Sequence, residues 1–291
     1  MTGSMAEIVE RLHGRVAIPY EDAFSPGRGL VLECYRPSSH AAGGPVVIVQ
    51  HGMGRNGDEY CDAWVPAADR HGAMIVAITY PAASWPGSRT YNDGHVREED
   101  GSVRPRAAWS NAIPSRVFRL LQDAGVTTRP HAYLWGHSAG AQFVHRLLGL
   151  QSTAWEAVGA GNAGWYTLPT LDLPYPEGLG GIGLDKGDVD RLLLTPLVIF
   201  AGDHDTEMTA ENLPKHAAAL AQGPHRFARA HAYLAAGRAE AMRRGIACAW
   251  RLVVVPGVGH EGMVMSAVAA SYWFEGVMPA AQAARTVGVE L

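Results

Sequence analysis

Short apolar runs recur along the chain, and each gives way to a polar, glycine-containing segment. Continuous runs of about four to eight apolar residues are typical of strands that a parallel sheet buries on both faces. Near the start of the chain, residues 15–20 and 30–35 predict two strands joined by a turn through the sequence SPGRG. The buried strands predicted after them lie at residues 45–50, 73–80 and 132–135, within 155–164, and at 196–202 and 250–257.

Segments with helical spacing or helix-favouring composition separate these strands. After Ser138, Phe143 and Leu147 are four residues apart, and so are Val144 and Leu148, which places each pair on one helical face. Strand and helix therefore alternate, and this predicts βαβ units and an α/β fold with a mostly parallel sheet and helices on both faces. The remaining predicted helices cover residues 58–71, 108–124, 211–221, 224–244 and 261–274.

Two stretches interrupt the regular alternation. Residues 81–105 and 165–190 are rich in glycine and proline, and loops of this length are usually functional or disordered. We find no internal repeat, low-complexity tract or linker that would divide the chain. We therefore expect one domain over residues 1–291, with irregular excursions near 81–105 and 165–190.

The composition narrows the class of protein. Hydrophobic residues make up 47% and charged residues 18% of 291 residues, which is ordinary for a globular protein with ample core. With a net charge of −4, the chain lacks the excess of positive charge that is typical of proteins that bind nucleic acid or an anionic membrane. No apolar run approaches the roughly 20 residues that span a bilayer. Three widely spaced cysteines without a CxxC pair indicate neither a disulfide scaffold nor a zinc site.

The first residues give an expectation about location. They lack the apolar core of a signal peptide, which favours a cytoplasmic, reducing location. A leader that had been removed beforehand would leave the same start. The sequence carries no signal for the oligomeric state.

The sequence Gly136-His137-Ser138-Ala139-Gly140 fits the pattern G-x-S-x-G. It follows a predicted strand and begins a predicted helix, which is the context of a nucleophile elbow. In such a turn the serine hydroxyl is exposed at the apex, and the flanking glycines avoid clashes with neighbouring backbone. The pattern predicts that Ser138 is a catalytic nucleophile; an incidental serine in a glycine-rich turn is the alternative.

A serine nucleophile requires a base, and the base requires an orienting carboxylate. His260 lies in a glycine-bordered loop after the strand at 250–257. This is the carboxyl end of a strand, where parallel sheets bind their ligands. Asp203 and Asp205 both follow the strand at 196–202. Asp205 is favoured as the acid because the carboxylate has to reach across to the imidazole, and Asp203 remains the alternative.

The oxyanion that forms during acyl transfer requires backbone N–H donors. One should be that of Ala139, directly after the nucleophile, and the other should come from the loop after the first buried strand. That loop reads His51-Gly52-Met53-Gly54, and its Met53 N–H is the candidate. His51 and His137 are expected to have structural roles.

Four segments, HGMG, GHSAG, GDHD and GVGH, each follow a strand, and together they resemble the α/β-hydrolase fold over residues 45–274. Within that fold, HGMGRNGDEYCDAW, GHSAGAQFVHRL and NAGWYTLP resemble the poly(3-hydroxybutyrate) depolymerase-like esterases, close to the feruloyl-esterase-like branch. The resemblance implies Ser138, Asp205 and His260 as nucleophile, acid and base, and Met53 and Ala139 as oxyanion donors. Secreted polymer depolymerases carry a leader, and many add a polymer-binding module; neither is visible here.

These observations predict a serine hydrolase that cleaves small carboxylic esters of short-chain or hydroxy acids, without metal or cofactor. Trp165 and Tyr166 follow the strand within 155–164 and are candidates for an aromatic wall of the acyl pocket, with ordinary core packing as the alternative. Other possibilities are a peptidase, thioesterase or acyltransferase with the same residues, or a non-catalytic binding protein of the same fold.

Overall fold

An eight-stranded sheet forms the centre of the computed structural model, which describes residues 12–280 and 284–285. The strands lie in the order β1-β2-β4-β3-β5-β6-β7-β8. The pairs β1–β2 and β2–β4 are antiparallel, and all later neighbours are parallel. The expected α/β-hydrolase type of sheet is therefore confirmed. The strand bounds are β1 Gly14–Glu21, β2 Gly29–Arg36, β3 Val46–Gln50, β4 Met74–Thr79, β5 Tyr133–His137, β6 Ala157–Gly161, β7 Leu197–Gly202 and β8 Trp250–Val255.

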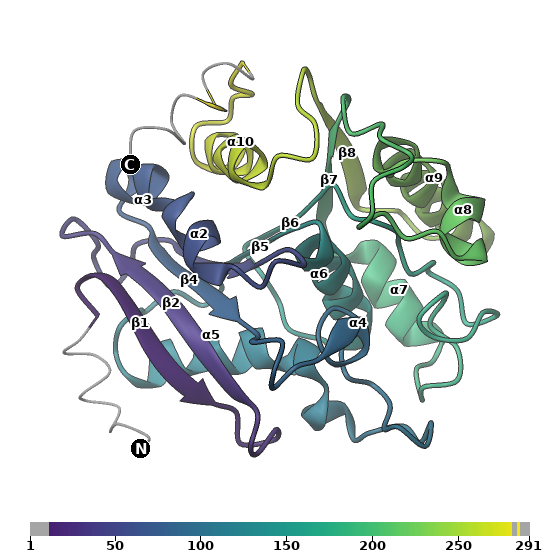
Figure 1. Cartoon of the computed structure of the whole chain (residues 1–291), viewed down its shortest axis with the longest axis horizontal. Helices are drawn as coiled ribbons and strands as arrows, with labels where there is room; N and C mark the ends of the chain where they lie inside the picture. The colour runs from purple at the N-terminus through teal and green to yellow at the C-terminus, as the bar shows by residue number, and fades with distance from the viewer. Residues whose placement is uncertain (1–11, 281–283, 286–291) are drawn as a thin grey trace.

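Helices cover both faces of the sheet because the side chains of the central strands alternate between two apolar clusters. In β3, Val46 and Ile48 point into one cluster, and Val47 and Val49 into the other. Figure 1 shows α2, α3 and α10 together on one side of the sheet, where they pack on the second cluster. The opposite face is covered by α5 Ile113–Asp123, α6 Ala139–Leu150, α7 Lys186–Leu194 and α9 Arg226–Arg244.

Prolines account for three differences from the expected helices. The helix expected at 58–71 is two helices, α2 Gly57–Asp62 and α3 Val65–His71, and Pro66 in the first turn of α3 lacks the N–H that would continue α2. The helix expected at 108–124 begins only at Ile113, with Pro114 in its first turn, after two short 3₁₀ turns. Residues 211–216, which contain Pro214, are not helical, so that the helix there is only α8 Ala217–Gln222.

The two irregular excursions contain more helix than expected. The first includes the short α4 Gly87–Thr90, and the second ends in α7, which begins at Lys186. A capping box starts α7, because the Asp185 side chain accepts a hydrogen bond from the Asp188 N–H and the Asp188 side chain accepts one from the Asp185 N–H. The remaining helix, α10 Gly262–Phe274, follows β8. Within the described residues, no helix has the length and apolar character needed to cross a bilayer.

Candidate active site

Ser138 lies at the sharp turn between β5 and α6. Its backbone has φ 57° and ψ −116°, a conformation that residues with a side chain seldom adopt and that a nucleophile elbow requires. Space around the turn is minimal: a Cβ added to Gly140 would collide with the carbonyl oxygen of Gln50, and one added to Gly136 with that of Gly140. The glycines at these two positions allow α6 to start against β3, with its positive end at Ser138.

His260 connects Ser138 to Asp205 through both of its ring nitrogens. Its Nε2 lies 3.0 Å from Ser138 Oγ, and its Nδ1 lies 2.7 Å from Asp205 Oδ2. The three residues follow β8, β5 and β7, so the carboxyl ends of parallel strands bring them together from distant parts of the sequence. The structure thus places the predicted nucleophile, base and acid in one hydrogen-bonded chain.

The two candidate acids have different surroundings. Asp205 is almost fully buried, and its second oxygen, Oδ1, lies 3.4 Å from Nη1 of the buried Arg226. Asp203 instead accepts a hydrogen bond from the Gly257 N–H at 2.7 Å and holds the β8 loop. Only Asp205 is within reach of His260.

A tyrosine–histidine pair, Tyr60 and His137, lies beside His260. A structural role was expected for His137, but its partner was not predicted. The His137 ring is 4.7 Å from the His260 ring, and the Tyr60 hydroxyl lies 2.8 Å from His137 Nδ1. Burial, followed by the nearby His260 and Arg226, holds the pKa of His137 well below its usual range. His137 is therefore neutral next to His260, so it does not oppose a positive charge on that ring. Tyr60 is 77 residues from His137 in sequence, and its place in the segment HGMGRNGDEYCDAW does not indicate this contact.

The loop after β3 approaches Ser138 closely. A Cβ on Gly52 would lie 3.7 Å from Ser138 Cβ, so the backbone that leads to Met53 runs beside the serine. Within the described part of the chain, the N–H groups of Met53 and Ala139 donate to no protein acceptor. Two backbone donors near the serine are thus available for an oxyanion.

His51 fixes the start of this loop. It is fully buried, its Nε2 accepts a hydrogen bond from the Tyr80 N–H at 3.0 Å, and its Nδ1 donates to the Gly52 carbonyl at 2.8 Å. Burial lowers the pKa of His51 to about 3. The ring is a neutral structural link between the loop and β4, consistent with the expected structural role.

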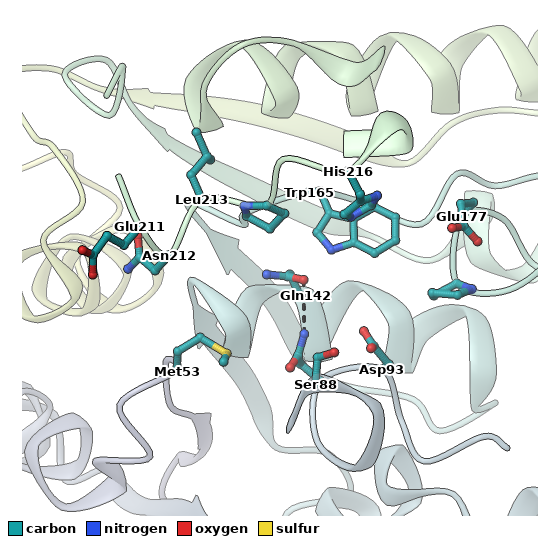
Figure 2. A pocket seen from close by; sticks show the side chains of 13 residues that line it. Met53, Ser88, Asp93, Gln142, Trp165, Glu177, Glu211, Asn212, Leu213 and His216 are labelled. Carbon is teal, nitrogen blue, oxygen red and sulfur yellow. Dashed lines mark hydrogen bonds between the residues drawn. The ribbon is translucent and has the colours of Figure 1, made fainter. Parts of the chain in front are cut away.

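A cavity of about 520 Å³ opens beside Met53 (Figure 2). Trp165 lines it, and the ring of His216 packs against the indole with centroids 4.4 Å apart. Tyr166 requires a correction. Its side chain is fully buried and stacks on Tyr233 with centroids 4.3 Å apart, so it belongs to the core and not to the pocket wall. Adjacent residues of this extended segment point in opposite directions.

The two excursions meet over the helix that carries the serine. Arg146 of α6, whose side chain is fully buried, donates to Asp93 at 2.8 Å and to Thr167 at 2.9 Å. The Tyr175 hydroxyl, from the second excursion, donates to the Asp93 carbonyl at 2.7 Å. Arg97, in turn, donates to the Gly181 carbonyl. One buried guanidinium therefore holds a residue of each excursion beside the cavity.

The cavity carries negative charge. Three carboxylates line it, those of Asp93, Glu177 and Glu211, and among the described residues only Asp93 has a guanidinium partner. None of the described lining residues is lysine or arginine. The described residues also contain no cluster of histidine, cysteine or carboxylate side chains that could hold a metal ion.

Solved structures define the class of protein. No protein-family model matches the chain, and no curated protein matches it by sequence. The chain is similar to a poly(3-hydroxybutyrate) depolymerase, LpqC from Bordetella parapertussis, at 46% identity and a TM-score of 0.93, over 97% of each chain. It is also similar to poly(aspartic acid) hydrolase-1 from Sphingomonas sp. KT-1, at 34% identity and a TM-score of 0.86, over 89% of this chain and 98% of that one.

With these neighbours and its sheet, the molecule is an α/β-hydrolase. A more distant likeness, to an S-formylglutathione hydrolase from Agrobacterium tumefaciens at 13% identity and a TM-score of 0.58, reflects the fold alone. Because the chain is 46% identical to the first neighbour over 97% of each chain, it belongs to the poly(3-hydroxybutyrate) depolymerase-like family. This membership supports a carboxylic ester hydrolase.

Proposed function

We propose that this protein is a serine esterase that cleaves small esters of short-chain or hydroxy acids through an acyl-enzyme. The observation that carries the proposal is the chain Ser138–His260–Asp205, with distances of 3.0 and 2.7 Å. Beside it lie two backbone N–H groups that have no acceptor among residues 12–280 and 284–285. A base within hydrogen-bond reach of a hydroxyl, itself oriented by a carboxylate, is the arrangement that activates a serine.

The proposed reaction has two halves. Ser138 Oγ attacks the ester carbonyl carbon while His260 Nε2 takes the hydroxyl proton, and the N–H groups of Met53 and Ala139 stabilise the oxyanion. The C–O bond to the alcohol then breaks, and His260 gives its proton to the leaving oxygen. Water attacks the acyl-enzyme, with His260 again as base. The acid leaves and the proton returns to Ser138.

Asp205 and His137 shape the charge on His260 during both halves. Asp205 accepts a hydrogen bond from Nδ1, which fixes the tautomer that leaves Nε2 free to accept a proton, and it stabilises the imidazolium that forms. His137 stays neutral at 4.7 Å, so that no second positive charge opposes the imidazolium.

Replacement of the nucleophile tests the proposal. Ser138→Ala should lower kcat for p-nitrophenyl butyrate by about 10⁶, as the loss of a catalytic serine does, and should prevent labelling by a fluorophosphonate. Peptide mapping of the labelled wild-type protein should find the adduct on Ser138. A Ser138→Ala protein that kept more than a few per cent of the activity, with an unchanged circular dichroism spectrum, would show that another residue is the nucleophile.

The size of the substrate has a separate test. Turnover of p-nitrophenyl esters should peak at short acyl chains, because a cavity of about 520 Å³ with three carboxylates does not suit a long apolar chain. Clearing of crystalline poly(3-hydroxybutyrate) film should be slow, since a polymer segment has to leave the crystal before it can enter the cavity. A maximum beyond about ten carbons, or rapid clearing of the film, contradicts this part of the proposal.

A further inference from the structure

Arg226, the first residue of α9, joins the proposed acid to the wall of the cavity. Its side chain is 2% exposed. Nη1 lies 3.4 Å from Asp205 Oδ1, and Nη2 donates to Asn212 Oδ1 at 2.7 Å. Asn212 lies in the loop between β7 and α8 and lines the cavity. A single buried cation therefore contacts both the proposed acid and a residue of the cavity wall.

The contact with Arg226 fixes which way the Asn212 amide points. A guanidinium can only donate hydrogen bonds, so the amide oxygen has to face Arg226 and the NH₂ group has to face away from it. No described residue accepts a hydrogen bond from this NH₂ group, and the residue as a whole is exposed at the cavity. Asn212 thus offers two oriented donors to a ligand in the pocket.

The surrounding charge restricts what those donors can bind. Figure 2 shows Glu211 and Asn212 at one end of the cavity and Glu177 at the other. Neither glutamate has a basic partner within the described residues, and no described lysine or arginine lines the cavity. A carboxylate on the substrate would meet these charges unfavourably, whereas a neutral carbonyl or ether oxygen would not.

We propose that Asn212 is a specificity-determining residue that donates a hydrogen bond to an uncharged oxygen of the substrate, and that Arg226 is the positioning residue that orients it. The proposal rests on the esterase function proposed above and specifies the substrate class: neutral esters with a second acceptor oxygen on the acyl side or the alcohol side. Because Arg226 also contacts Asp205, it affects both the recognition of the substrate and the rate of the reaction.

Matched substrates separate the acceptor from chain length and charge. The p-nitrophenyl esters of monomethyl succinate, glutarate and adipate match hexanoate, heptanoate and octanoate in length but carry a second ester group. At one of these spacings the wild type should prefer the second-ester substrate over the alkanoate by about three- to tenfold in kcat/KM, the range of one hydrogen bond to a neutral group. The free-acid p-nitrophenyl adipate should be a poorer substrate than its methyl ester.

Variants of Asn212 test the donor. Asn212→Asp keeps an acceptor for Arg226 and removes the donors, so the preference for the second ester should disappear while the contact with Arg226 is retained. Asn212→Leu removes the donors without adding charge and should also abolish the preference. A preference that survives in both variants would overturn the proposal, as would a wild type without preference at any spacing.

A double-mutant cycle tests the role of Arg226. Arg226→Met should lower the preference to the level of Asn212→Leu and should also lower kcat for the alkanoates. In the Asn212→Leu background, Arg226→Met should change the preference no further, since it acts on recognition only through Asn212. Additive effects on the preference would refute this role. Arg243→Met, at the exposed far end of the same helix, is the matched control and should leave both quantities unchanged.

Hydrolysis of the p-nitrophenyl alkanoates distinguishes a failure of the role proposed for Asn212 from a failure of the esterase function. If Ser138→Ala abolishes alkanoate hydrolysis while the Asn212 variants leave the preference intact, the esterase function stands and the role of Asn212 is wrong. If the wild type hydrolyses no p-nitrophenyl ester and takes no fluorophosphonate label, the proposed function itself fails.

Discussion

Two aspartates separated by one residue provide a test at the scale of the single residue. Asp205→Asn should lower kcat by about 10⁴, because the imidazole loses the partner that fixes its tautomer. Asp203→Asn is the matched control: Asn retains an oxygen for the Gly257 N–H, so kcat should change little. Steady-state kinetics on p-nitrophenyl butyrate measure both variants. The reverse ranking would assign the acid to Asp203.

The residues predicted from the sequence were those with a local signature. Ser138 has flanking glycines in a recognisable pattern, and His260 and Asp205 follow strands at the expected places. The contacts of Tyr60, Arg226 and Asn212 could not be predicted, because each forms only when separate segments pack together. Tyr166 was misplaced for a related reason. It is next to Trp165 in sequence, and only the packing on Tyr233 shows that its ring points into the core.

At the scale of the element, the elbow depends on the contact between α6 and β3. Gly140→Ala would place a methyl group against the carbonyl oxygen of Gln50, so the helix has to move away from the sheet. We expect a loss of several kcal/mol in the free energy of unfolding, of the order found for overpacked buried sites, together with a large loss of activity.

Gly29→Ala is the control for this substitution, because nothing lies within 4 Å of a Cβ at the start of β2. Urea unfolding and p-nitrophenyl butyrate kinetics on both variants give the comparison. An equal and small effect of the two substitutions would mean that the elbow is less tightly packed than the structure shows.

Apolar runs and prolines explain which strands and helices could be predicted from the sequence. Continuous apolar runs specified the buried strands, and the structure confirms them. The helix bounds were less accurate at Pro66, Pro114 and Pro214, where helical composition continues through a residue that cannot donate a backbone hydrogen bond. No helix was predicted at α7, whose capping box uses Asp188 in place of the usual Glu or Gln.

At the scale of the whole molecule, buried histidines make stability depend on pH. Burial lowers the pKa of His51 to about 3 and holds the pKa values of His137 and His145 well below the usual range. The unfolded chain binds protons at these sites below about pH 6.5, whereas the folded protein does not. Their contribution to stability is therefore complete above pH 6.5 and decreases as the pH falls toward the folded pKa.

Each such histidine should reduce the free energy of unfolding by about 1.4 kcal/mol per pH unit below pH 6.5, or about 2 kcal/mol at pH 5. Urea unfolding at pH 7.5 and pH 5 measures the change. His145→Gln should be less stable at pH 7.5 but should lose less between the two values. His204→Gln, whose side chain is exposed, should follow the wild type. Equal stability of the wild type at both pH values would contradict this account.

The buried guanidinium of Arg146 has a consequence for how the pocket can be exchanged between relatives. Asp93 belongs to one excursion and Thr167 to the other, and both accept hydrogen bonds from Arg146 of α6. A chimera that imports only one of these loops would leave part of that side chain's hydrogen bonding unmade in a site without solvent. When loops are grafted between members of this family, the two excursions and the residue at position 146 should therefore be exchanged together or not at all.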